Sequence, residues 1–225
     1  MRHRNRRERE SEELRSKILD AARELFATEG YARVSMRKIA DRIEYSPTTI
    51  YHYFENKEAI VSQLLAEIYA EFYGTLQRRY DELMEAGADL PARLLLVCRE
   101  YVEYGITHPE HYDLLFVSDL EGASRSRLDK NDRLNGFNML RDSIEEAIGQ
   151  DLLDASPDES ADMIAKSAWS VLHGLTSTLI RFPGSVEMYN VGPDAVSPED
   201  RQMIDFTLRR YFRSLLRPGT ALPEL

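Results

Sequence analysis

Apolar side chains recur every three or four residues along almost the whole 225-residue chain, and this spacing limits the fold more than any other feature. In the first such segment Leu14, Ile18, Ala22 and Leu25 fall on one face of a helix. Alternation with a period of two, which would indicate half-buried strands, is absent over any useful length. The pattern therefore predicts an all-α protein of about nine helices.

Capping residues predict where these helices begin. Ser46 followed by Pro47 combines a capping hydroxyl with proline at the first helical position, and Asn56 is placed to cap the long helix after it. Ser156-Pro157 and Ser197-Pro198 give the same signal later in the chain. We expect helices at about 12–28, 36–43, 47–54, 57–85, 91–106, 109–117, 127–149, 157–182 and 198–216.

Charge is unevenly distributed along a chain whose formal net charge is −10. Residues 1–60 carry 13 Lys/Arg against 11 Asp/Glu, whereas residues 61–225 carry 16 against 28. Five of the first nine residues are Arg. This asymmetry indicates a DNA-facing end and an acidic body, and the Arg-rich arm could reach a minor groove. A solvated basic tail explains the charge alone equally well.

Composition argues against several other classes of protein. Cys98 is the single cysteine, so the chain can form neither an internal disulfide nor a multi-cysteine zinc site, and a reducing cytoplasm is the expected location. No apolar run approaches the roughly 20 residues that span a bilayer, so we expect no membrane partner. Glycine-rich phosphate loops, nucleophile elbows and His-Glu-x-x-His motifs are absent, so no enzyme activity, cofactor or metal is expected.

A short helix, a three-residue turn and a second short helix follow one another between residues 36 and 54. This arrangement is typical of the helix-turn-helix, whose second helix enters the major groove of DNA. Ile50 and Phe54 of that helix face the core, while the opposite face offers hydroxyl, phenol and imidazole groups to bases and phosphates. A packed aromatic cluster is the alternative for Tyr51, His52 and Tyr53. Consecutive helical side chains point about 100° apart, however, so at least one must be exposed.

Three stretches, Gly30-Tyr31, Val34 to Ala40 and Ser46 to Glu58, together resemble the DNA-binding domain of the TetR family over about residues 15–65. The resemblance implies backbone contacts from Ser35 and Arg37, groove contacts from the second short helix, and a phosphate contact from Lys57. Many members of that family carry Gly where this chain has Thr48, whose methyl group could meet a thymine. The expected DNA-binding residues are Ser35, Arg37, Ser46, Pro47, Thr48, Thr49, Tyr51, His52, Tyr53 and Lys57.

The family resemblance also implies a homodimer formed through the last two helices. In the first of them, small residues recur every four positions, which would let another helix approach closely. In the second, apolar residues recur at spacings of four, three and four. Packing within one subunit is the alternative explanation. The expected interface residues are Ser170, Gly174, Thr178, Ile204, Leu208, Tyr211 and Leu215.

The segment around Trp169, His173 and Gly174 resembles the Trp…His-Gly (WHG-type) signature of one subgroup of TetR C-terminal domains. Trp169 and His173 lie four apart on one helix face and could line a ligand pocket, or both could be ordinary core residues. Other aromatic residues of the body present the same choice between pocket and core. The candidate ligand-binding residues are Tyr101, Tyr104, Phe116, Phe137, Trp169 and His173.

These patterns together predict four parts: a disordered basic arm at 1–11, a helix-turn-helix domain at 12–57, a ligand-binding and dimerisation domain at 58–217, and a tail at 218–225. A linking helix at 57–86 begins the larger domain. The expected function is a homodimeric repressor that leaves operator DNA when a small apolar or aromatic ligand fills a void on the order of several hundred Å³. An enzyme, and a DNA-binding protein without a ligand, are the alternatives.

Overall fold

The structure is a computed structural model that describes residues 2–117, 136–156, 158–182 and 196–223. In these residues nine α-helices, one 3-10 turn, one π-helical turn and no strand are found, which confirms the all-α prediction. The elements are α1 (Arg2–Glu29), η1 (Tyr31–Arg33), α2 (Met36–Arg42), α3 (Pro47–Tyr51), α4 (Lys57–Glu85), α5 (Leu90–Thr107), α6 (Pro109–Tyr112), η2 (Asp113–Val117), α7 (Gly136–Gly149), α8 (Ala161–Arg181) and α9 (Pro198–Leu215).

The chain divides into two compact units, and the division falls inside α4. Of the described residues, unit 1 comprises 2–69 and 110–117, and unit 2 comprises 70–109, 136–156, 158–182 and 196–223. The sequence places this boundary earlier, at residue 57, and assigns α6 to the larger domain. The first half of α4 thus packs with the helix-turn-helix, and its second half belongs to the body.

Two helix starts differ from the sequence expectation. Helix α1 begins at Arg2, where the sequence predicts a disordered arm, and an Arg6–Glu10 pair at 2.8 Å supports its first turns. Helix α8 begins at Ala161 rather than at residue 157, because Ser160 accepts the amide of Met163 and provides a competing cap. The stretch 127–135, expected to begin α7, lies outside the described residues.

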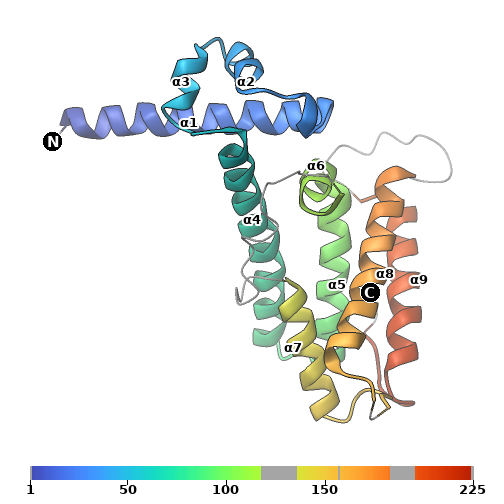
Figure 1. The fold of residues 1–225 in the computed structure, drawn as a ribbon. Coiled ribbons are helices and arrows are strands. Elements are labelled where there is room, and N and C mark those ends of the chain that lie inside the picture. The colour runs from blue at the N-terminus through green and yellow to red at the C-terminus, as the bar shows by residue number, and fades with distance from the viewer. Residues whose placement is uncertain (1, 118–135, 157, 183–195, 224–225) are drawn as a thin grey trace. The chain divides into compact units, whose positions relative to one another are not determined.

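Unit 1 is held by a small apolar core and by caps at each helix start. In Figure 1, α2 and α3 lie against one side of α1. The caps predicted at Ser46 and Asn56 are confirmed, since Ser46 accepts the amide of Thr49 and Asn56 accepts the amide of Ala59, and Ser35 caps α2 in the same way by accepting the amide of Lys38. The core residues, all at most 1% exposed, are Ile18, Ala22, Ile39, Ala40, Ile50, Ile60 and Leu64.

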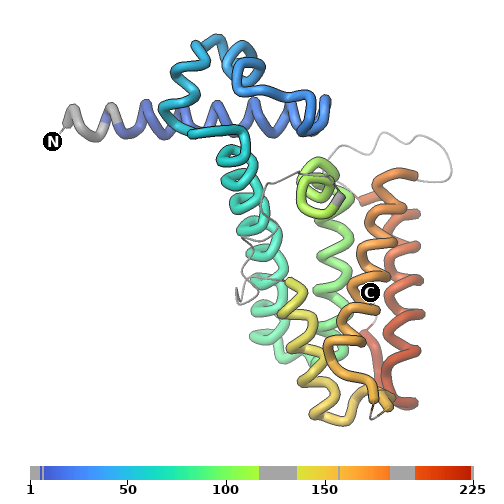
Figure 2. Tube along the Cα trace, viewed as in Figure 1, coloured from blue at the N-terminus to red at the C-terminus, as the bar shows by residue number. Residues whose placement is uncertain are grey.

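Unit 2 is a helical bundle centred on α5. Figures 1 and 2 show α8 and α9 running side by side along α5, with α7 against α8. Leu95 and Val102 of α5 are completely buried. Backbone bonds from Asp154 to Leu215 and from Arg217 to Leu152 fasten the segment after α7 to the end of α9. None of the described helices is long and apolar enough to cross a membrane.

Candidate functional site

The outer face of α3 is exposed and carries polar groups. Ile50 is 0% exposed and Phe54 is 4% exposed, so both anchor α3 in unit 1 as predicted. Tyr51 is 54% exposed, and Thr48 and His52 are exposed beside it. The aromatic residues of this stretch therefore do not form one packed cluster, and a phenol, a hydroxyl and an imidazole face solvent together.

The turn before α3 fixes where that helix begins. Glu44 adopts a φ of 61°, a left-handed conformation, and the amide of Tyr45 donates back to the carbonyl of Ala40 at 3.0 Å. The Ser46 hydroxyl accepts the amide of Thr49 and lies 2.9 Å from the Thr49 hydroxyl. Ser46 and Thr49, two of the expected DNA-binding residues, thus use their side chains to form the helix start. Pro47 is half-buried at its first position.

Arg15 of α1, which the sequence reasoning missed, holds the end of α3 in place. Its guanidinium lies 4.5 Å from the centre of the Phe54 ring. It also donates to the carbonyl of Tyr53 and to the side chain of Gln63, each at 3.4 Å. Tyr53 itself is half-buried. Arg15 therefore connects α1, the end of α3 and α4 in one cluster.

The cations of α2 divide into paired and exposed groups. Lys38 is ion-paired with Glu29, and Arg42 with Glu24, so both fasten α2 to α1. The side chain of Arg37 is 83% exposed, and its contact with the Asp41 carboxylate is a long one of 3.9 Å. Arg37 is thus the α2 cation best placed to meet a phosphate.

Lys57, at the start of α4, makes internal contacts that the sequence did not predict. Its ammonium donates to the carbonyls of Tyr31 and Val34 at 2.9 and 3.0 Å, and lies 3.8 Å from the centre of the Tyr31 ring. These bonds use two of its three N–H groups and leave one for a phosphate. The backbone amide of Glu58 and the Tyr31 hydroxyl, 2.8 Å from it, lower the pKa of the Glu58 carboxyl.

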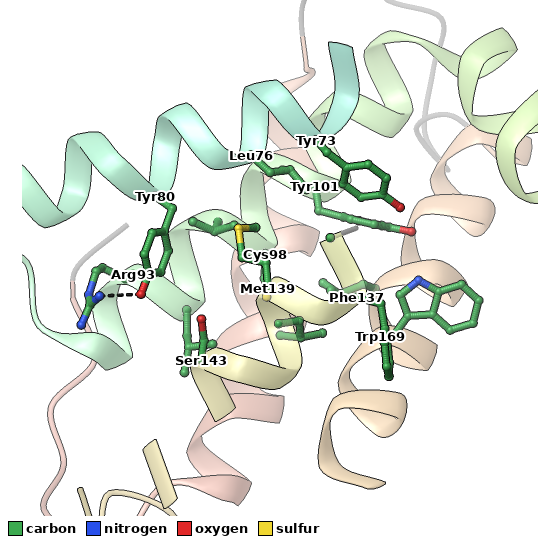
Figure 3. A pocket seen from close by; sticks show the side chains of 15 residues that line it. Tyr73, Leu76, Tyr80, Arg93, Cys98, Tyr101, Phe137, Met139, Ser143 and Trp169 are labelled. Carbon is green, nitrogen blue, oxygen red and sulfur yellow. Dashed lines mark hydrogen bonds between the residues drawn. The ribbon is translucent and has the colours of Figure 1, made fainter. Parts of the chain in front are cut away.

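A cavity of about 40 Å³ lies inside unit 2, between α4, α5, α7 and α8. Figure 3 shows its aromatic walls converging on it. At roughly 10–15 Å³ for one water, it has room for about three water molecules. The cavity itself is smaller than the expected void of several hundred Å³, so that expectation is not met at this place in unit 2. The lining residues are Tyr73, Leu76, Tyr80, Arg93, Leu94, Val97, Cys98, Tyr101, Gly136, Phe137, Met139, Leu140, Ser143, Trp169 and Leu172.

Half of the candidate ligand residues line this cavity, namely Tyr101, Phe137 and Trp169. His173 stacks on Trp169 with 4.9 Å between ring centres but does not line the cavity, and burial lowers its pKa. Tyr104 lines a separate open groove of unit 2, beside Glu100 and Glu103. Burial, and then the neighbouring Glu103, raise the pKa of the Glu100 carboxyl.

Phe116 lies in unit 1, where it packs 4.9 Å from Tyr112 between ring centres. It therefore does not line the cavity that holds Tyr101 and Trp169.

Polar residues at one end of the cavity were missed from the sequence. Arg93 is only 7% exposed, and its guanidinium donates to the Tyr80 hydroxyl at 2.6 Å and to Glu146 at 3.3 Å. The signal that could have found it is an arginine within the apolar run from Leu90 to Cys98. Cys98 also lines the cavity, and burial raises the pKa of its thiol to about 12.

The expected interface residues of α8 lie on an exposed face. Ser170, Gly174 and Thr178 are all exposed, and both hydroxyls donate to carbonyls of their own helix. Met163 and Phe182 add apolar surface to the same helix, at 58% and 71% exposed. The stripe that Ser170, Gly174 and Thr178 form therefore has small side chains whose hydroxyl groups are already hydrogen-bonded.

The expected interface residues of α9 need a correction. Ile204 and Leu208 are 0% exposed within the chain, so they are core residues. Tyr211 and Leu215 are half-buried. The exposed apolar residues of α9 are instead Met203 and Phe206, at 50% and 67%. Helix α9 has two apolar faces, and the spacing rule selected the inner one.

Two family models match separate parts of the chain. The model described as bacterial regulatory proteins, tetR family, matches residues 18–64, which contain α2 and α3. The model described as tetracyclin repressor-like, C-terminal domain, matches residues 94–196. The Trp…His-Gly subgroup is not distinguished by either match and stays a prediction.

Curated relatives match mainly at the helix-turn-helix end. The chain is 38% identical over 58 residues to the HTH-type transcriptional regulator UidR of Escherichia coli, a match covering 26% of this chain and 30% of UidR. It is 32% identical over 95 residues to the HTH-type transcriptional repressor KstR2 of Rhodococcus jostii, covering 42% of this chain and 45% of KstR2. The chain thus spans less than half the length of these relatives, which are transcriptional regulators.

Solved structures share the fold over a much larger part of the chain. The transcriptional regulator FadR from Bacillus subtilis, solved in complex with stearoyl-CoA, superposes with a TM-score of 0.67 and 19% identity, and covers 88% of this chain and 98% of FadR. At this identity the similarity concerns the fold alone.

Proposed function

Because this chain belongs to the TetR family of bacterial transcriptional regulators, we propose that it is a cytoplasmic, homodimeric repressor that binds operator DNA through the outer face of α3. A small ligand held in unit 2 releases it from that DNA. The single observation that carries the proposal is the exposure of Thr48, Tyr51 and His52 on a helix whose other face is buried through Ile50.

The chemistry of this face fits the major groove. A threonine methyl can contact a thymine methyl, and hydroxyl, phenol and imidazole groups can bond base edges or phosphate oxygens. The exposed guanidinium of Arg37, at the preceding helix, supplies a charge for the DNA backbone. Ser46 and Thr49 support the helix start, so we assign them a positioning role rather than a direct contact.

The exposed faces of α8 and α9 support a two-fold dimer. Ser170, Gly174 and Thr178 would allow close approach of a second helix, while Met203 and Phe206 would lose solvent on association. In such a dimer, two copies of α3 would read half-sites one DNA turn apart, about 34–36 Å.

The ligand must open the cavity before it can fill it. A site of about 40 Å³ holds no molecule larger than a few atoms, so binding favours a state of unit 2 with its walls moved apart. A ligand shifts a protein only toward the state that it binds better, and this requirement makes opening the step that can weaken DNA binding. The stearoyl-CoA complex of FadR is in keeping with a largely apolar ligand.

The proposal is tested by fluorescence anisotropy of labelled double-stranded DNA taken from upstream of the protein's own gene. We expect saturable binding that weakens as salt rises, because phosphate contacts release counterions. Scrambled DNA of the same length is the control. Equal affinity for both DNAs would contradict operator recognition.

A DNA-binding protein without a ligand is the second candidate, and the small volume of the cavity favours it. The two candidates differ in the response of bound DNA to added apolar compounds. Release of the upstream DNA by any of them supports the sensor. A complex that persists in all of them, with no binding to unit 2, supports the second candidate.

A further inference from the structure

A buried cation at one end of the cavity suggests which chemical class of ligand the cavity accepts. We propose that unit 2 binds amphipathic anions, molecules with an apolar or aromatic body and one carboxylate, and that Arg93 binds the carboxylate. This inference rests on the proposed function, because it takes the cavity to be the sensor site. Neither the family matches nor the relatives assign a role to Arg93.

Arg93 is placed where a cation is costly unless it is paired. Its side chain is 9% exposed, and burying an unpaired charge costs far more than burying a neutral polar group. Its Nη atoms donate to the neutral Tyr80 hydroxyl and to Glu146 at 3.3 Å, and one also contacts the sulfur of Met84. The Nε atom is buried and has no hydrogen-bond partner in the part of the chain that is described.

The counter-charge of Arg93 is incomplete. Glu146 on α7 meets it through a single long contact, and the Glu146 side chain is itself 40% exposed. An arginine can offer a carboxylate two parallel N–H groups, which is its strongest mode of binding. The present pairing leaves that mode unused, so a second carboxylate arriving from the cavity side would gain the Nε donor, which has no partner among the described residues.

The cavity is polar at one end and aromatic at the other. Figure 3 shows Arg93, Tyr80 and Ser143 at one end, and Tyr101, Phe137 and Trp169 at the other. No Asp or Glu is among the fifteen lining residues, so a cationic ligand would meet Arg93 and no acidic lining residue. A neutral ligand would leave the buried Nε atom of Arg93 without a charged partner. An anion with an apolar body suits both ends.

This placement also connects the ligand to the bundle. Arg93 belongs to α5 and Glu146 to α7, so their pairing is a link between two helices that pack on each other. A ligand carboxylate competes with Glu146 for the same guanidinium. Binding would therefore loosen this link while the apolar body pushes the walls apart, and both effects favour the opened state.

The test uses three probes that differ only in their head group: phenylbutyrate, phenylbutanol and phenylbutylamine. Trp169 is the only tryptophan of the chain and lines the cavity, so its fluorescence reports on occupancy. We expect phenylbutyrate to bind wild-type protein about 10- to 100-fold more tightly than phenylbutanol, as a charge-assisted hydrogen bond predicts. Phenylbutylamine should bind most weakly. Equal affinities, a preference for the amine, or no binding by any probe would overturn the inference.

Variants locate the preference at Arg93. In Arg93→Met we expect the affinities for phenylbutyrate and phenylbutanol to differ by no more than about twofold. Arg93→Lys keeps the positive charge and should retain part of the preference for the carboxylate. Arg99→Met is the matched control, since Arg99 lies on the same helix, is 18% exposed, pairs with Glu103 at 2.8 Å and does not line the cavity. Its ratio of the two affinities should equal that of the wild type. Unchanged selectivity in Arg93→Met would overturn the assignment.

Two measurements keep this inference separate from the proposed function. Thermal unfolding of each variant shows whether it is folded. The preference of wild-type protein for phenylbutyrate over phenylbutanol is measured without any variant. Binding of the upstream DNA is measured on the same protein without any probe. If the protein without a probe does not bind the upstream DNA, the proposed function is contradicted. If it binds that DNA but prefers phenylbutanol to phenylbutyrate, only the proposed ligand class is contradicted.

Discussion

The outer face of α3 in unit 1 and the cavity of unit 2 both gather tyrosines with polar groups, yet they are built in opposite ways. Tyr51 is 54% exposed on a surface built by one short helix, whereas Tyr101 is 6% exposed in a cavity lined by residues from four helices. The face of α3 is complete without a partner. The cavity is nearly filled by its own walls, so its ligand must displace protein atoms. A preformed surface suits a long polymer, and a narrow cavity that must widen suits a switch.

The thiol of Cys98 gives the largest expected effect, because it reports whether the cavity is closed. Burial raises its pKa from 9.0 to about 12, a difference of three pH units. At pH 8 the native thiol should therefore react with Ellman's reagent about 1000-fold more slowly than in denatured protein, since the thiolate is the nucleophile. The neutral thiol stabilises the fold below pH 9, and that contribution is lost as pH rises toward 12.

Reaction of native Cys98 at the denatured rate would show an open cavity. It would remove the contrast between the two regions.

Ile50→Ala should give the largest loss of stability at the recognition helix. Ile50 is completely buried under α3, and truncating such a residue costs about 2–5 kcal/mol. Chemical denaturation, followed by far-UV circular dichroism, measures the free energy of unfolding. A loss below about 1 kcal/mol would mean that α3 is not anchored by this contact.

Tyr51→Ala, one residue further along, should weaken DNA binding and leave the stability of the fold nearly unchanged. We expect the affinity for upstream DNA to fall about 10- to 100-fold, while the free energy of unfolding changes by less than about 0.5 kcal/mol. The physical reason is that Tyr51 is exposed and contributes little to the core. Anisotropy measures the affinity. An unchanged affinity, or unfolding comparable to Ile50→Ala, would contradict the assigned face.

Gly136→Ala should give a smaller effect, located at the cavity. A Cβ at Gly136 would collide with the ring of Tyr73, which lines the cavity, so the ring must shift at a cost of about 1–3 kcal/mol. Gly74→Ala is the control, because nothing lies within 4 Å of a Cβ there. As an alanine within a helix it should stabilise by about 0.5–1 kcal/mol. Thermal unfolding of both variants compares them, and equal behaviour would mean that the contact with Tyr73 is not tight.

Signals between residues close together in the sequence predicted the helix-turn-helix better than they predicted the cavity. Ser46 and Asn56 cap helices as expected, because a cap depends on residues only three positions apart. The buried positions of Ile50 and Phe54 follow from helical spacing in the same way. Lys57 departs from expectation because its partners, Tyr31 and Val34, lie more than twenty residues away.

In unit 2 the sequence could not show which face of a helix is buried, or which residues of different helices lie close together. Ile204 and Phe206 both belong to apolar patterns of α9, yet one is 0% exposed and the other 67%. Arg93 and Trp169 line the same cavity although no sequence spacing relates them. Such outcomes depend on how α5, α7, α8 and α9 pack, which periodicity within a single helix does not encode.

Hydroxyl-radical footprinting of the upstream DNA tests most directly whether paired copies of α3 read an operator. The account predicts two protected patches about one helical turn apart on one side of the duplex, and the loss of both with the Tyr51→Ala protein. A single continuous protection independent of DNA sequence, or the same two patches with Tyr51→Ala, would contradict it.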